Sequence, residues 1–180
     1  PSLTSQQTIS LENVIGISEQ ALPDDTARMA LRSLAVFPPK PSAFSEEAAL
    51  ACMDSGIEML DLFVDMGLVE TSGQARYQLH QSITEYLRIK GVPLEARERF
   101  VGYYTDWLEQ VQQDDTIIGT ELDNIEAALA TAENVGQKKA FISLVDHFFP
   151  FIEKKALWEL IDELLPKAAA EAKALGDYRT

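Results

Sequence analysis

Apolar side chains recur at helical spacing along the first forty residues. Residues 10–22, "SLENVIGISEQAL", place apolar positions three to four residues apart behind a serine that can cap a helix. "DDTARMALRSLAVF" predicts a second helix, with Asp24 or Asp25 as its cap. Its expected apolar stripe is Met29, Leu31, Leu34, Ala35 and Phe37. The three prolines within 38–42 then predict a loop.

Two more helices are predicted before the periodicity changes. Ser45 is the expected cap of a short helix that is broken at residues 54–56, "DSG". Residues 57–67, "IEMLDLFVDMG", are strongly amphipathic and end at Gly67, a good C-terminal cap. Ile57, Leu60 and Phe63 or Val64 are expected on the core side, and Glu58, Asp61 and Asp65 on the opposite side.

Residues 68–79, "LVETSGQARYQL", change to the two-residue period of β-strands. Two short runs flank "SGQA", which predicts a β-hairpin with a glycine-containing loop. The alternation separates two faces, Tyr77 and Leu79 on one and Arg76 and Gln78 on the other.

The rest of the chain is predicted to be helical. A helix from about Gln81 to Lys90 has Ser82 and Glu85 at capping-box spacing. Further helices are expected over 94–113, 121–136 and 137–154, with one or two more over 156–178. Pro150 is expected to bend or end its helix, and "DDTIIGTELD" is expected to be a loop packed on the core. Helix pairs with glycine ends are typical of stacked helical hairpins, and "LPKAAAEAKALGDY" is similar to the second helix of a tetratricopeptide unit.

The charge distribution disfavours nucleic acid as a partner. The 180 residues include 15 Lys and Arg against 29 Asp and Glu, a net charge of −14. Neither 41–75 nor 101–137 contains a single Lys or Arg. A DNA-reading helix at 57–66 would need cations where three carboxylates stand, and the hairpin adds only Arg76. The remaining acids, at Asp114, Asp115, Glu121, Asp123 and Glu126, are expected in a solvated loop and at a helix start.

Most catalytic and metal chemistry is not expected of this chain. Cys52 is the one cysteine, and no G-x-x-x-x-G-K-[ST] phosphate loop occurs. We therefore expect no catalytic residue, no metal site and no enzyme activity. The sequence contains neither a bilayer-spanning apolar run nor a signal peptide, so no membrane contact is expected. The lone Cys52 excludes a disulfide framework and fits a reducing, cytoplasmic setting. Pro1 and a helical pattern that runs to the last residues indicate a fragment of a longer protein.

The two histidines stand in different contexts. His147, in "LVDHFFPF", is expected to be a helix-packing residue, since its neighbour Asp146 would not face it on a helix. The aromatic residues Tyr103, Tyr104, Trp107, Phe148, Phe149, Phe151 and Trp158 are expected in the core, with some lining a partner groove. His80 stands where the hairpin meets the next helix. It is either a phosphate contact at a helix N-terminus or a partly buried polar residue that joins strand to helix.

Five segments in order carry a family resemblance: "ALPDDTARMALRSLAVFP", "FSEEAALA", "EMLDLFVDMGLVE", "RYQLHQSITEYLR" and "ELDNIEAALATAENVG". They resemble the winged-helix domain, and the helical region behind it, of bacterial STAND-class signalling NTPases of the NB-ARC or AP-ATPase type. The resemblance covers roughly 10–136, and more loosely the chain to 180. It implies a mainly α fold, with a winged-helix domain and two-stranded β-hairpin over 1–92 and an α-helical, tetratricopeptide-like region over 93–180.

The resemblance also implies a regulatory role. In such proteins a P-loop ATPase domain precedes the winged helix, which packs on it and helps to lock the ADP-bound state. The family carries a Met-His-Asp-like motif whose histidine contacts the β-phosphate of ADP. Leu79, His80 and Gln81 match that motif here. Because Gln81 replaces the acid, His80 alone is carried over, as a nucleotide contact in the full-length parent.

The partners implied follow from that architecture. The fragment itself would hold no cofactor, whereas the parent would bind ADP or ATP with Mg. The nucleotide-binding domain would be its partner in cis, and the helical arm would receive a protein or small-molecule signal. The alternative is a winged-helix transcription regulator that binds DNA.

Overall fold

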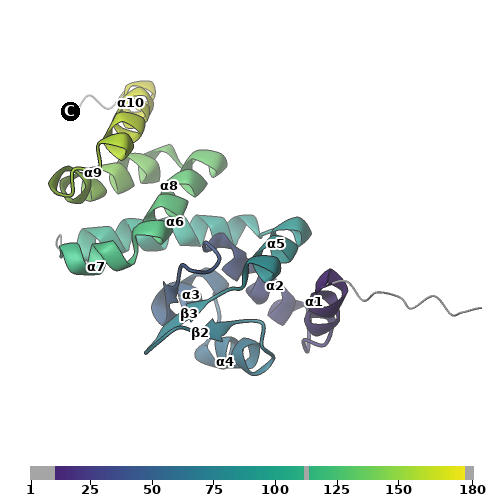
Figure 1. Ribbon diagram of the computed structural model, residues 1–180. Helices are drawn as coiled ribbons and strands as arrows, with labels where there is room; N and C mark the ends of the chain where they lie inside the picture. Colours follow the sequence, from purple (N-terminus) through teal and green to yellow (C-terminus); the bar gives the residue numbers. More distant parts are fainter. Residues whose placement is uncertain (1–10, 112–113, 177–180) are drawn as a thin grey trace, which may run out of the picture.

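Helices dominate the part of the chain that the computed structural model describes, residues 11–111 and 114–176 (Figure 1). In chain order the elements are α1 (Leu11–Gln20), α2 (Asp25–Ser33), the 3₁₀ turn η1 (Leu34–Val36), β1 (Phe44–Ser45), α3 (Glu46–Met53), α4 (Ile57–Asp65), β2 (Glu70–Thr71), β3 (Arg76–Gln78), α5 (Gln81–Lys90), α6 (Leu94–Gln110), α7 (Asp115–Thr120), α8 (Leu122–Val135), α9 (Lys138–Lys154) and α10 (Trp158–Leu175). The mainly α prediction is confirmed. None of these helices combines the length and apolarity needed to cross a bilayer.

A small antiparallel sheet with strand order β1-β3-β2 lies among the first helices. β2 and β3 form the predicted hairpin, with Thr71 opposite Tyr77. The sheet has a third strand that was not predicted, because β1 pairs with the other edge of β3 and places Phe44 opposite Tyr77. β1 is two residues long and its partner is distant in sequence, so no local periodicity marks it. The predicted faces of β3 are confirmed, since Tyr77 and Leu79 are buried.

Side-chain caps explain where several helices begin. Asp24 accepts a hydrogen bond from the Ala27 N–H at 2.8 Å, and Ser45 accepts one from the Ala48 N–H at 3.1 Å, as predicted. The predicted Ser82–Glu85 capping box is wrong. His80 is the N-cap of α5, because its Nδ1 accepts from the Ser82 N–H at 3.2 Å and Ser82 already lies within the helix. The serine expected to cap the first helix lies outside the described residues.

The long C-terminal helices tolerate their prolines. Pro150 does not end α9, which continues to Lys154, and α10 is one helix across Pro166. A proline removes one backbone hydrogen bond, but α9 is held by a buried apolar face against α6, α8 and α10. The "DDTIIGTELD" segment is likewise not a plain loop, because Asp114 caps the short helix α7 by accepting from the Thr116 and Ile117 N–H groups at 2.9 and 3.2 Å.

Helix α6 connects the sheet-containing part to the last four helices. It packs on α3 along one side and on α8 and α9 along the other, and α8 to α10 stack away from the sheet in Figure 1. Phe100 of α6 is fully buried and meets Phe37 edge-on at a centroid distance of 5.1 Å. One continuous apolar cluster therefore extends from α2 to α10.

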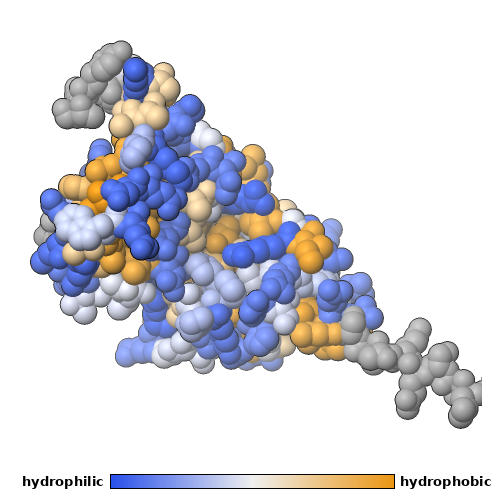
Figure 2. All heavy atoms as spheres, turned by 45° about the horizontal axis from the view of Figure 1, so that its top comes forward, coloured by the Kyte–Doolittle hydropathy of each residue, from blue (hydrophilic) through white to orange (hydrophobic). Residues whose placement is uncertain are grey.

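Some predicted core positions are exposed instead. Met29 is 46% exposed, although the other members of its predicted stripe are buried. In α1, Ile15 is buried while Leu11, Val14 and Ile17 face outward, and Figure 2 shows an apolar patch beside the grey N-terminal residues. The pattern of α1 is apolar on more than one side, so periodicity alone could not select the side that meets α5.

Gly136 ends α8 in the left-handed conformation, at φ 74°. We expect Gly136→Ala to lower the free energy of unfolding by about 1 kcal/mol, because a Cβ disfavours this conformation. Chemical denaturation measures the change. Gly119→Ala is a matched control, since Gly119 lies inside α7 without a positive φ and an added Cβ would meet nothing within 4 Å. A loss at Gly136 no greater than at Gly119 would contradict the expectation.

Candidate functional site

His80 lies at the step from the sheet to α5. Leu79 before it is fully buried, which anchors the end of the strand. The His80 carbonyl accepts from the N–H groups of Ile83 and Thr84, both at 3.0 Å, and from the buried Thr84 hydroxyl at 3.3 Å. Three donors therefore fix the backbone of His80, although its side chain is exposed.

The imidazole of His80 presents a donor outward. Its Nδ1 accepts the capping hydrogen bond, so the neutral ring carries its hydrogen on Nε2. Nε2 has no partner among the described residues. The first turn of α5 contains no acidic residue, so the positive end of the helix dipole is not neutralised there. His80 thus joins the strand to the helix, as the second interpretation expected, but its side chain is exposed and not partly buried. Its Nε2–H is left available to an anion at the helix N-terminus.

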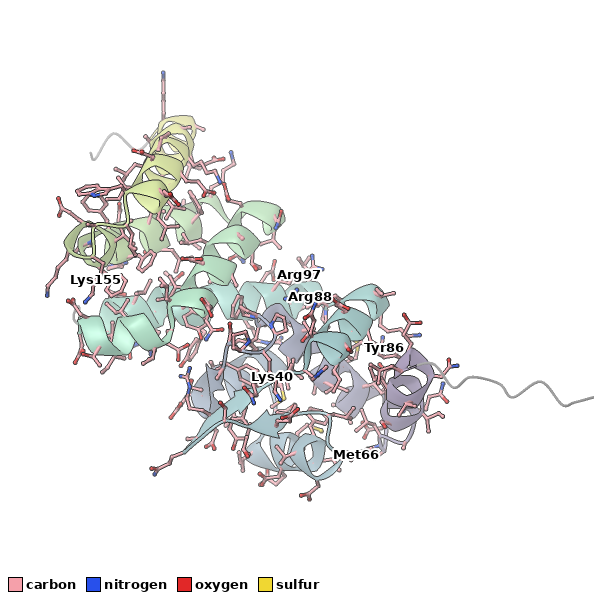
Figure 3. All side chains as sticks on the ribbon, in the orientation of Figure 1. Lys40, Met66, Tyr86, Arg88, Arg97 and Lys155 are labelled. Carbon is pink, nitrogen blue, oxygen red and sulfur yellow. The ribbon has the colours of Figure 1, made fainter. Side chains whose placement is uncertain are left out.

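Two residues near His80, Gln81 and Lys40, make contacts that the sequence did not predict. Gln81 is exposed and donates along the helix to Glu85 at 2.9 Å. Lys40, which no sequence pattern singled out, lies against the strand that leads to His80, since its N–H donates to the Leu79 carbonyl at 2.9 Å. Its ammonium group pairs with Glu70 on β2. The proline-containing loop therefore brings a cation to this edge of the sheet (Figure 3).

A second cluster, which we call the polar joint, consists of Arg76, Tyr104, Glu121 and Asn124. Glu121 is only 4% exposed. Its Oε2 accepts from the Tyr104 hydroxyl at 2.6 Å and from the Asn124 amide at 2.7 Å, and its Oε1 pairs with Arg76. Burial, followed by the Glu121 charge, raises the pKa of Tyr104, so this phenol stays protonated and remains a donor.

The polar joint links the sheet to the helices behind it. The Arg76 guanidinium also donates to the Ala43 carbonyl at 2.7 Å, and the Asn124 amide donates to the same carbonyl at 2.9 Å. Ala43 precedes β1, Arg76 belongs to β3, and the other members belong to α6 and the start of α8. The relative placement of sheet and helical arm is therefore fixed by directional bonds as well as by apolar packing.

Glu121 lies at a helix start, as expected from the sequence, but it is buried and not solvated. Asp123 and Glu126 are exposed as expected, but Glu121 is in helical phase with the buried Ile125 and Ala128. That phase is a signal that the sequence does contain, since positions four and seven residues apart share a helix face. The partner Arg76 could not be found in this way because it lies on a distant strand.

The other candidates fall into the core or the surface. His147 is half-buried and its Nδ1 lies 2.8 Å from the Ser143 carbonyl one turn earlier, which confirms its packing role. Of the aromatic set, Tyr104, Phe148 and Phe151 are buried, whereas Trp158 is 62% exposed on α10.

We expect the cap at His80 to contribute measurably to stability. His80→Ala removes the side-chain acceptor for the Ser82 N–H and should lower the free energy of unfolding by about 0.5–1 kcal/mol. His80→Asn supplies another capping side chain and should be near neutral, as should Ser82→Ala. Urea denaturation of the three variants tests the assignment, and a larger loss in Ser82→Ala than in His80→Ala would contradict it.

The described residues offer limited further chemistry. No group of three or more His, Cys, Asp or Glu converges within them to hold a metal ion. Cys52 is buried, which raises the pKa of its thiol and keeps it protonated. At the step from the sheet to α5, His80 has an Nε2 that could meet an anion from outside, and the nearby Lys40 ammonium is paired with Glu70. Comparisons of the chain with models of protein families, with curated proteins and with solved structures find no match.

Proposed function

We propose that this chain is a non-catalytic regulatory part of a STAND-type signalling NTPase. Its sheet-containing part acts as a winged helix that clamps the nucleotide domain in the ADP state, and the helices from α6 onward act as a sensor or partner-binding arm. The observation that carries the proposal is the exposed imidazole of His80 at the N-terminus of α5, whose Nε2 has no partner among the residues that the structure describes.

The element order supports the proposal. A helix, a short strand, two helices and a hairpin follow one another, and the strand order β1-β3-β2 is that of a winged helix. The next helix begins directly behind β3, with His80 as its N-cap, and this supports matching "LHQ" to the nucleotide-sensing motif of the family. A ligand phosphate at this place would meet an N–H donor and the positive end of a helix dipole together.

The alternative, a DNA-binding regulator, is disfavoured by the charges. Glu58, Asp61 and Asp65 are exposed on α4, the helix that would enter the major groove. Arg76, the cation of the hairpin, is held in an ion pair with the buried Glu121. The carboxylates of α4 would repel the DNA phosphates, and the Arg76 guanidinium is already paired with Glu121. Because phosphate contacts supply most of the affinity for DNA, neither element favours binding.

We therefore expect no binding to duplex DNA even at about 50 mM salt, where electrostatic attraction is strong. Fluorescence anisotropy of a labelled duplex measures this, with a basic winged-helix protein as the positive control. Sub-micromolar affinity that falls steeply with added salt would favour the alternative.

The nucleotide role is tested in the full-length NTPase. We expect His80→Asp to speed the release of bound ADP by about tenfold or more, because a carboxylate replaces a charge-compatible donor beside the phosphate. Asp still caps a helix, so stability should hold. Gln81→Ala is the matched control and should release ADP at the wild-type rate. An unchanged release rate in His80→Asp would remove the role given to His80.

A further inference from the structure

A cleft of about 550 Å³ lies near the C-terminal end of α5, one helix length from His80. Residues of η1, α5, α6 and α8 line it. Arg88 of α5 and Arg97 of α6 both contribute, and Figure 3 shows the two labelled arginines next to each other. Among the described residues, no carboxylate lines this cleft. The cleft that adjoins the polar joint, in contrast, is lined by Glu47, Asp106 and Glu121.

Arg88 is held in place from behind. Its Nε donates to the Ala35 carbonyl at 3.0 Å and its Nη2 to the Phe37 carbonyl at 3.1 Å. These two bonds fix the plane of the guanidinium, while Nη1 has no partner among the described residues. Partial burial lowers the pKa of Arg88, and the charge of Glu85 acts in the opposite direction. An arginine remains charged after such a change, so the cleft keeps this cation.

Arg97 is the less usual of the pair. It is half-buried, yet its guanidinium has neither a hydrogen bond nor an ion pair within the described residues. The Arg97 guanidinium therefore keeps its N–H donors for a group that enters the cleft, which Arg88 also lines. Asn134 of α8, whose side chain has no partner there either, adds an amide at the rim. This arrangement is found in a chain with a net charge of −14, where carboxylates are abundant.

We propose that this cleft binds a phosphate group, as the free ion or as part of a small phosphorylated molecule. Two guanidinium groups match the double negative charge of a phosphate, and their planar forks bind its oxygens in pairs. The bound group would bridge α5 to α6 and α8, and so would brace the sheet-containing part against the helical arm. The proposal does not depend on the proposed nucleotide role of His80, which lies at the opposite end of α5.

The test is isothermal titration calorimetry of the 180-residue chain with inorganic phosphate and with pyrophosphate, at constant ionic strength. We expect saturable binding to the wild type. Arg97→Gln should weaken it by about tenfold or more, since one charge-assisted contact is lost. Because the Arg97 side chain makes no hydrogen bond or ion pair with the described residues, this variant should remain folded, as circular dichroism would confirm. Arg97→Lys should bind with intermediate affinity, because it keeps the charge and loses the fork.

Matched controls separate this cleft from other cations. Arg28→Gln removes an arginine that pairs with Asp25 on α2, and it should bind phosphate like the wild type. Succinate, a dicarboxylate, should bind more weakly than phosphate. The proposal is overturned if the wild type shows no saturable binding, if Arg97→Gln binds equally well, or if succinate binds as tightly. Loss of binding in His80→Asn alone would place the phosphate at the start of α5, which would overturn the cleft but not the nucleotide role.

Discussion

Replacing Glu121 by leucine should lower the free energy of unfolding by about 3 kcal/mol or more, the cost of breaking a buried ion pair. The Glu121 carboxylate is 4% exposed and serves Arg76, Tyr104 and Asn124 at once. Its removal leaves the buried Tyr104 hydroxyl without an acceptor, takes one of two acceptors from the Asn124 amide, and leaves a partly buried guanidinium without a counter-charge. The Arg76 side chain is 26% exposed, so water can reach part of its charge. We therefore expect a loss of unfolding free energy near the lower end of the range of about 3–5 kcal/mol.

A double-mutant cycle isolates this pair. Arg76→Leu combined with Glu121→Leu should be less destabilised than the sum of the two single variants, because neither charge is then left alone. Glu109→Ala, at an exposed carboxylate on α6, is the matched control and should change stability by less than about 0.5 kcal/mol. Trp107 packs 6.0 Å from the Tyr104 ring, so its fluorescence reports the joint directly. Additive single and double changes would show that the pair does not couple the two parts.

Phe100→Ala should be destabilising by about 3–5 kcal/mol, the usual cost of a large cavity in a core. Phe100 is fully buried and contacts Phe37 and Tyr104 edge-on, at centroid distances of 5.1 and 5.2 Å. It thus supports the sheet-containing part and the helical arm from a single position on α6. We therefore expect the substitution to shift one common unfolding transition.

The two tryptophans of the chain can show whether the region around α6 and the last helix unfold in one common transition. Trp107 lies on α6 beside the joint, and Trp158 begins α10. In the single-tryptophan variants Trp158→Phe and Trp107→Phe, the fluorescence midpoint should agree with the midpoint from circular dichroism. Leu165→Ala, at a side chain that is 39% exposed, is the control for a mild truncation. Separate midpoints, with only one of them moved by Phe100→Ala, would contradict a shared core.

Local chemistry made much of this fold predictable. Asp24 and Ser45 cap helices where the sequence placed them, and Gly136 ends α8 because a helix end in the left-handed conformation favours glycine. The hairpin followed from alternation around a glycine-containing loop. These signals act within a few residues, so one sequence suffices to find them.

The features that escaped prediction depend on contacts between distant segments. β1 exists because β3 offers it a free edge, and no pattern in two residues could announce that. Pro150 stays inside α9 because tertiary packing outweighs one lost backbone bond. At the candidate site, His80 was found by its position behind a strand, whereas Lys40 and Arg97 were missed. The residues around Lys40 and Arg97 belong to segments that are distant in the sequence and meet only in the folded chain.

We propose above that this chain clamps a nucleotide domain in its ADP state. The most direct measurement is the affinity of the 180-residue chain for the isolated nucleotide-binding domain of the NTPase, by calorimetry, with ADP and then with ATP. We predict tighter binding with ADP, a preference that His80→Asp reduces by about tenfold or more while Gln81→Ala preserves it. Equal affinity in the presence of either nucleotide, or a preference that His80→Asp leaves intact, would contradict the account.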